Sequence, residues 1–152
     1  MEFNDITIVG LKGIPYGSVI ESLSKNKDFA VMNASFVLGC SHVESAAMHA
    51  SRSFENGTNR SKTFVTEFLL YMAGERQISK ALTKMTPKDG EDMVAVVFNN
   101  TTDLSKLEKY RDDMLIEATE EKAKLIGWNG KERISYEDLA LEMVAFVDIL
   151  KV

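Results

Sequence analysis

The chain of 152 residues has 45% apolar and 27% charged residues, which is typical of a soluble globular protein, so we expect a single domain over residues 1–152. Its single cysteine excludes an internal disulfide and favours a reducing, cytoplasmic setting. The formal net charge of −5 argues against a protein that coats nucleic acid over its whole surface, and no apolar run approaches the roughly 18 residues of a membrane span.

The first third of the sequence predicts two strands and a short helix. Residues 6–11, ITIVGL, are rich in β-branched side chains and predict a strand. A glycine-containing turn then leads to a predicted helix over residues 16–24, and the spacing of its glycines matches no phosphate-binding loop. Residues 29–38 predict a second strand, with a bulge or kink at residues 33–35.

Two long helical patterns follow in the middle of the chain. Ser41 and Glu44 match a capping box and predict a helix that runs to about Phe54. The stretch 61–85 predicts two helices joined at Gly74, because glycine enters the left-handed conformation of a helix end at little steric cost. The first of these helices is apolar around most of its circumference, which predicts a buried helix at the centre of the core.

The last third of the sequence predicts one strand, one ambiguous segment and several helices. Residues 93–98, MVAVVF, predict a strand that is buried on both faces. Residues 114–117 fit a short strand. Helices are expected at residues 101–110, at residues 120–126 and at residues 135–150, the last with Ser135 as its N-cap.

No known catalytic motif is present, so we expect neither an enzyme nor a bound cofactor or metal. One alternative stays open. Cys40, His42 and His49 would form the centre of a small metal- or thiol-dependent enzyme if the fold brought them together. They are a thin ligand set, however, and a cysteine at the end of a strand is more often a small core residue.

Positive charge is concentrated between residues 51 and 88. This segment has seven cations and three anions, whereas the remainder of the chain is acidic. The local excess predicts one surface that faces an anion, and the alternative is that these cations only solvate helix faces. Glu67 is the one carboxylate on the predicted buried helix, and we expect it to pair with Arg60 or Arg76, because a buried charge needs a partner.

The run TEFLLYMAGERQISKAL, residues 66–82, resembles the most characteristic stretch of the small KEOPS-complex subunits of the TPRKB family. The preceding NRSKT and the later MVAVVF stand in the order that this family has, and the resemblance spans most of the chain. It implies an α/β (α+β) fold in a single domain, with a small mixed β-sheet packed by several α-helices.

The resemblance also implies a function. Members of this family are non-catalytic subunits of the complex that makes threonylcarbamoyl adenosine in tRNA. They bind and regulate a PRPK-type atypical kinase, and archaeal-type members capture tRNA through its 3′ CCA end. We therefore expect the kinase and tRNA as direct partners, the other KEOPS subunits as indirect partners, and no membrane contact.

Two sets of residues are candidates for these contacts. Phosphate contacts and stacking hold single-stranded RNA ends. The expected tRNA-binding residues are Arg52, Asn59, Arg60, Lys62, Arg76, Gln77 and Lys80. The expected kinase-binding residues, on an exposed apolar part of the last helix, are Ala140, Met143, Val144 and Val147. The alternative for these four is that they belong to the core.

Overall fold

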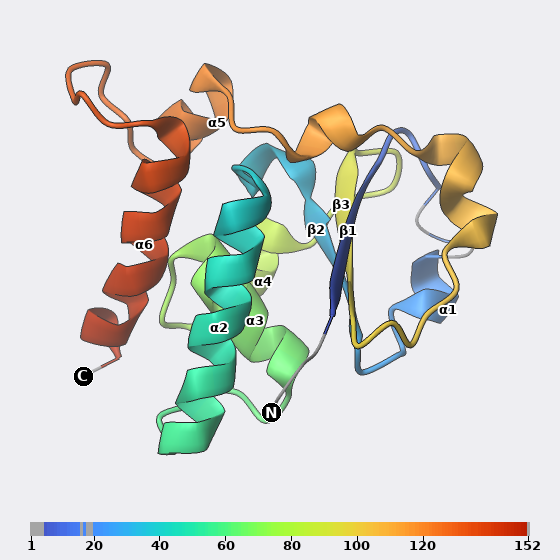
Figure 1. Ribbon diagram of the computed structural model, residues 1–152, viewed down its shortest axis with the longest axis horizontal. Helices are drawn as coiled ribbons and strands as arrows, with labels where there is room; N and C mark the ends of the chain where they lie inside the picture. Colours follow the sequence, from blue (N-terminus) through green and yellow to red (C-terminus); the bar gives the residue numbers. More distant parts are fainter. Residues whose placement is uncertain (1–4, 16, 18–19, 152) are drawn as a thin grey trace.

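A computed structural model, which describes residues 5–15, 17 and 20–151, has an α+β fold built on one small sheet (Figure 1). The sheet contains β1 (Ile6–Leu11), β2 (Phe29–Asn33) and β3 (Met93–Phe98), in the order β1-β3-β2. The predicted fold class is confirmed. Both pairs of neighbouring strands are antiparallel, however, so the mixed sheet implied by the resemblance is wrong.

β3 is the central strand, and all six of its residues are buried, as predicted. It has a strand on each edge and packed side chains over both faces, which explains its continuous apolar run. β2 ends earlier than predicted. The Asn33 side chain accepts a hydrogen bond from the Ser35 N–H at 3.0 Å, and a short 3₁₀ helix, η2 (Ala34–Phe36), follows in place of more strand.

Most of the helices lie on one side of the sheet (Figure 1). They are α2 (Cys40–Asn56), α3 (Phe64–Ala73), α4 (Ile78–Met85) and α6 (Tyr136–Leu150). The short α1 (Glu21–Leu23) lies on the other side; residues 16, 18 and 19 of the helix predicted there fall outside the described part of the chain. None of the described helices is both long enough and apolar enough to cross a membrane.

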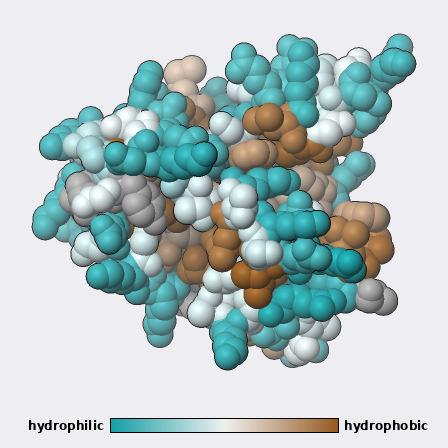
Figure 2. Space-filling view, turned by 180° about the vertical axis from the view of Figure 1, so that it is seen from behind, coloured by the Kyte–Doolittle hydropathy of each residue, from teal (hydrophilic) through white to brown (hydrophobic). Residues whose placement is uncertain are grey.

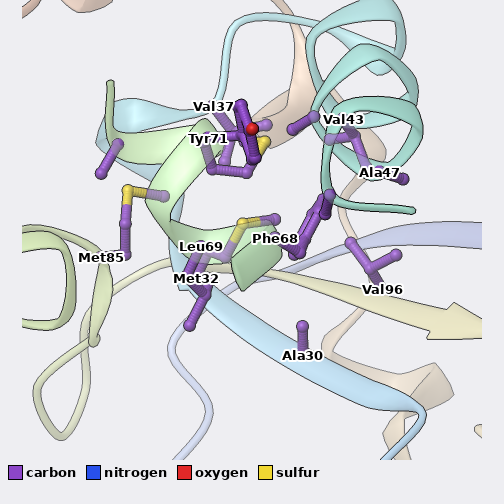
Figure 3. Close-up of a cluster of buried hydrophobic side chains, with 14 of the residues drawn as sticks. Ala30, Met32, Val37, Val43, Ala47, Phe68, Leu69, Tyr71, Met85 and Val96 are labelled. Atoms are coloured by element: carbon purple, nitrogen blue, oxygen red, sulfur yellow. The ribbon is translucent and has the colours of Figure 1, made fainter. Parts of the chain in front are cut away.

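α3 is the centre of the core, as predicted, and eight of its ten residues are buried. Figure 3 shows its side chains between α2 and the strands of the sheet. Thr63 caps the start of α3, because its hydroxyl oxygen accepts a hydrogen bond from the Thr66 N–H at 3.3 Å. Gly74 ends α3 with φ of 69°, and a Cβ atom there would lie 2.4 Å from Cγ of Met143. Backbone conformation and packing therefore both require glycine.

The predicted cap of α2 is wrong. The helix begins at Cys40, directly after Gly39, and no side chain caps it. The Ser41 hydroxyl instead donates a hydrogen bond to Glu137 of α6 at 3.2 Å. Ser41 therefore connects α2 to α6 and does not cap the start of α2.

The last third of the chain is less regular than its sequence pattern predicts. Within residues 101–110 only η3 (Ser105–Tyr110) is helical, and it is a 3₁₀ helix. Residues 114–117 are not a strand, because η4 (Asp113–Ile116) begins where the Asp112 carboxylate accepts a hydrogen bond from the Met114 N–H. The other two predicted helices are confirmed as α5 (Glu120–Leu125) and as α6, which Ser135 caps by accepting from the Asp138 N–H at 3.0 Å.

Candidate functional site

A buried ion pair joins the C-terminal end of α6 to α3. Glu67 and Lys151 have side chains only 0% and 4% exposed, and the Lys151 ammonium donates to Oε2 of Glu67. Ser53 of α2 donates to the same oxygen at 3.0 Å. The second oxygen, Oε1, accepts from the backbone N–H groups of Arg60 at 2.9 Å and Ser61 at 3.0 Å. One carboxylate therefore holds α2, α6 and the loop before α3 together.

These partners keep Glu67 ionised. Burial alone would raise its pKa, but the hydrogen bond and charge of Lys151, with the hydrogen bonds from Ser61 and Ser53, hold the pKa below its ordinary value. The expectation of an Arg60 or Arg76 side chain as its ion-pair partner is wrong. Arg60 reaches Glu67 only through its backbone, and its guanidinium donates to the carbonyl oxygen of Lys151.

The network continues from Lys151 to the surface. The Lys151 ammonium donates to the Tyr71 hydroxyl at 2.8 Å and lies 4.4 Å from the centre of the Tyr71 ring. The Tyr71 hydroxyl in turn donates to Asp148, whose other oxygen lies 3.0 Å from Nδ1 of His49. Burial and then the hydrogen bond to Asp148 raise the pKa of Tyr71, so its hydroxyl stays a donor.

This network forms one wall of a surface hollow of about 540 Å³, which we call the basic hollow. It lies between the end of α2, the loop that follows and the last turn of α6. Its charged and polar lining includes His49, Arg52, Asn59, Arg60, Asp148 and Lys151. Arg52 and Arg60 are exposed, whereas the Lys151 charge is already paired, so the two guanidinium groups carry the positive charge that a ligand would meet.

The structure brings together only part of the predicted tRNA-binding set. Arg52, Asn59 and Arg60 line the basic hollow, and the exposed Lys62 follows two residues later without lining it. The other three, Arg76, Gln77 and Lys80, come after the far end of α3, which at ten residues is about 15 Å long. The seven residues expected to bind tRNA therefore do not all line one hollow.

Lys80 instead lines a separate, shallow groove of about 450 Å³ beside α4. Its neighbour Lys84 is engaged there, because its ammonium donates to the carbonyl oxygen of Ala73 at 2.9 Å and lies 3.6 Å from Glu75. The groove therefore offers little free positive charge beyond Lys80 itself.

The predicted kinase-binding set is mostly core. Ala140, Val144 and Val147 are fully buried, and Met143 is half-buried, because α6 turns these residues towards α2 and α3. An exposed surface made of them is therefore wrong.

Other residues form the exposed apolar part of α6. Phe146 is 50% and Ile149 is 63% exposed, and residues three apart are neighbours on a helix. On the side of the molecule shown in Figure 2, hydrophobic residues gather in patches separated by hydrophilic ones.

Cys40, His42 and His49 do not form a site. His42 is fully buried, accepts from the Leu38 N–H at 3.1 Å through Nδ1 and donates to the carbonyl oxygen of Met72 at 3.2 Å through Nε2. Burial lowers its pKa to about 4. Cys40 is exposed at the helix start, and partial desolvation of its thiol, followed by the nearby charges of Glu44, Asp113 and Glu137, raises its pKa. No cluster that could hold a metal ion occurs in the described part of the chain.

Sequence reasoning missed Lys151, Asp148 and the role of His49. Lys151 lies 84 residues from Glu67, and a buried carboxylate predicts that a cation must be near without saying which one. The sequence signal that could have found it is weak. Lys151 directly follows the last apolar turn of a helix, and a lysine in that position usually points into solvent.

A family model described as kinase binding protein CGI-121 matches residues 17–144, which include α2 to α5 and most of the sheet. No curated protein gives a significant match. Because the family model covers most of the sequence, the chain belongs to the kinase binding protein CGI-121 family.

Proposed function

We propose that this chain is a non-catalytic subunit of a KEOPS-type complex. As that subunit, the chain binds and regulates a PRPK-type atypical kinase and recruits tRNA through the 3′ CCA end of the tRNA. Membership of a kinase-binding family supports the first role. The resemblance over residues 66–82 supports the link to threonylcarbamoyl adenosine in tRNA, and the single cysteine favours a cytoplasmic location. The basic hollow is the single structural observation that supports the RNA contact.

The chemistry of the basic hollow suits the end of a single strand. Arg52 and Arg60 supply two guanidinium groups that bind phosphates and stack on bases. The Asp148 carboxylate accepts hydrogen bonds, as ribose hydroxyls and base amino groups require. The acidic remainder of the chain repels a duplex, which favours contact limited to a few nucleotides. Lys62 extends the same contact along the chain.

The RNA role is tested with full-length tRNA and the same tRNA lacking CCA, across a salt series. We expect tight binding only with CCA present, and weaker binding for Arg52→Ala and Arg60→Ala. Lys80→Ala is the matched control, because it removes an exposed cation outside the hollow. Binding that ignores the CCA end would reduce the hollow to a general phosphate contact, and equal losses for Lys80→Ala would remove it as the site.

The kinase role is assigned to the exposed face of α6. Phe146 and Ile149 are large apolar side chains on one side of that helix, and apolar anchors of this kind dominate protein interfaces. Phe146→Glu should weaken binding of the purified kinase roughly tenfold or more in calorimetry. Leu82→Glu on α4, at a residue 36% exposed, is the control and should bind as the parent does. Unchanged binding by Phe146→Glu would place the kinase elsewhere.

A further inference from the structure

A groove with apolar and acidic lining residues, which we call the acidic groove, lies at the end of the molecule opposite the basic hollow. It has a volume of about 290 Å³ and runs between η4, α5 and the turn after β2. Met114 and Leu125, which are 73% and 55% exposed, both line it, and Leu115 and Ala34 also contribute to its lining. Met114 is the most exposed large hydrophobic side chain in the described part of the protein. Exposed apolar groups that share one groove indicate a binding surface more strongly than isolated ones do.

The surroundings of this groove are acidic. The segment 112–121, DDMLIEATEE, contains five acidic residues and no basic one. Asp92 and Glu121 line the groove itself, and neither forms an ion pair within the described residues. Two other acidic residues of the segment are already paired, Asp113 with Arg111 at 2.9 Å and Glu120 with Lys124 at 3.6 Å.

The lysine of the groove bonds to backbone oxygen atoms rather than to these carboxylates. Lys122 directs its ammonium inward, where it donates to the carbonyl oxygens of Val37 at 2.8 Å, Leu115 at 2.5 Å and Glu117 at 2.8 Å. An ammonium has three hydrogens, and all three are used. A ligand in the groove therefore meets carboxylates and apolar side chains, and no free cation among the described lining residues.

The groove is formed in advance rather than by the ligand. Gly39 at the start of α2 donates to the carbonyl oxygen of Ile116 at 2.7 Å. On the other side, Asp112 donates to the carbonyl oxygen of Gly10 at 2.9 Å, and Gly10 donates to the carboxylate of Asp113 at 3.0 Å. The approach is so close that a Cβ atom on Gly10 would lie 2.1 Å from the carbonyl oxygen of Asp112. η4 is therefore fixed to both α2 and the sheet.

We propose that this acidic groove docks a protein segment that carries apolar side chains flanked by lysine or arginine. Apolar anchors would cover Met114 and Leu125, and the flanking cations would meet Asp92 and Glu121. The negative charge excludes nucleic acid as the occupant. The contact is independent of the proposed RNA site, because α2, about 25 Å long at 17 residues, separates the groove from the basic hollow.

The test uses the full chain with ¹³C-labelled methionine methyl groups and two synthetic peptides. One peptide contains leucine and arginine, and its matched counterpart has glutamate in place of each arginine. The arginine peptide should bind and shift the methyl signal of Met114, while that of Met48, which is 55% exposed and lies on α2, stays in place. The glutamate peptide should bind at least about tenfold more weakly.

Variants decide whether the groove itself is responsible. Leu125→Ser and Glu121→Lys should each weaken binding of the arginine peptide several-fold, and Leu82→Ser on α4, outside the groove, should leave it unchanged. Both groove positions are exposed, so the variants should unfold at the parent temperature. Equal binding of the two peptides, an equal shift of Met48, or full binding by the groove variants would each overturn the proposal.

Two further outcomes would assign the groove to another occupant. Concentration-dependent dimerisation of the chain alone, abolished by Met114→Ser in sedimentation experiments, would make a second copy the occupant and overturn the proposal. A shift of the Met114 methyl signal by a single-stranded oligonucleotide would overturn it as well. Neither result would affect the proposed roles of the basic hollow or of α6, so the two sets of claims fail separately.

Discussion

The basic hollow and the acidic groove lie at opposite ends of α2, and each is shaped by a lysine that is withdrawn from solvent. Lys151 pairs with the buried carboxylate of Glu67, so its charge is neutralised and the two arginines of the hollow dominate. Lys122 is held by three backbone carbonyl oxygens and forms no ion pair with a carboxylate within the described residues, so the acidic side chains lining the groove stay unpaired. The sign of each surface therefore depends on where an ammonium is placed, which a net charge of −5 does not reveal.

The comparison is tested most strongly by removing the Lys151 ammonium. Lys151→Met leaves Glu67 buried without its counter-ion, and we expect a loss of about 3–5 kcal/mol in the free energy of unfolding, measured with urea at neutral pH. Adding Glu67→Gln should recover part of this loss. Lys124→Met, which breaks an exposed pair, is the control and should cost no more than about 0.5 kcal/mol. Equal losses for the two lysines would contradict the buried-pair account.

Lowering the pH tests the buried His42, which lies between the basic hollow and the acidic groove and connects Leu38 to Met72 by hydrogen bonds. Its pKa is lowered to about 4 from an ordinary value of 6.5, so below pH 6.5 the unfolded chain binds a proton that the folded chain does not. Stability should therefore fall by up to about 3 kcal/mol between pH 6.5 and pH 4. Urea unfolding at several pH values measures this slope, and His42→Gln should flatten it. A variant with the same slope as the parent would show that other groups cause the loss.

Removing the other withdrawn lysine should cost less. Lys122→Met leaves three carbonyl oxygens without a donor but no buried charge, and we expect a loss of about 1–3 kcal/mol. Burial lowers the pKa of Lys122 to about 8. Between pH 8 and the ordinary value of 10.5 the unfolded chain binds more protons, so this residue should make stability rise with pH. Unfolding curves at alkaline pH should show that the variant lacks this rise.

The smallest expected effect concerns the exposed arginines of the basic hollow. Arg52→Ala should weaken tRNA binding several-fold and lower the slope of log affinity against log salt by about 1, because one phosphate contact is lost. Arg76→Ala removes an exposed cation at the far end of α3 and should leave the slope unchanged. Identical slopes for all three proteins would mean that the hollow does not bind phosphate.

Local patterns predicted the parts of the fold that depend on neighbours in sequence. Gly74 was predicted as the end of α3 and Ser135 as the cap of α6, because each signal lies within one helical turn. β3 was predicted from its unbroken apolar run. The parts that failed depend on distant partners, such as Ser41, which bonds to α6 rather than to its own helix.

The candidate site was harder to predict for the same reason. The orientation of α6 is ambiguous in sequence, because apolar residues occur around most of its circumference, and the structure buries Val144 while exposing Phe146. The cations at the two ends of α3 are close in sequence but separated by the length of the helix. Arg52 and Arg60, which line the basic hollow, stand out in the sequence by their charge, whereas the network that fixes the Arg60 backbone required the fold.

The order of the strands has a consequence for synthesis of the chain. The central strand, β3, is the last of the three described strands to be translated, so β1 and β2 leave the ribosome without a partner to pair with. The sheet-facing side of α3 is also uncovered at that stage, because Phe98 supplies the ring against which Phe64 and Phe68 pack. A nascent chain that ends before Phe98 therefore exposes two strand edges and an apolar helix, which are the features that chaperones recognise.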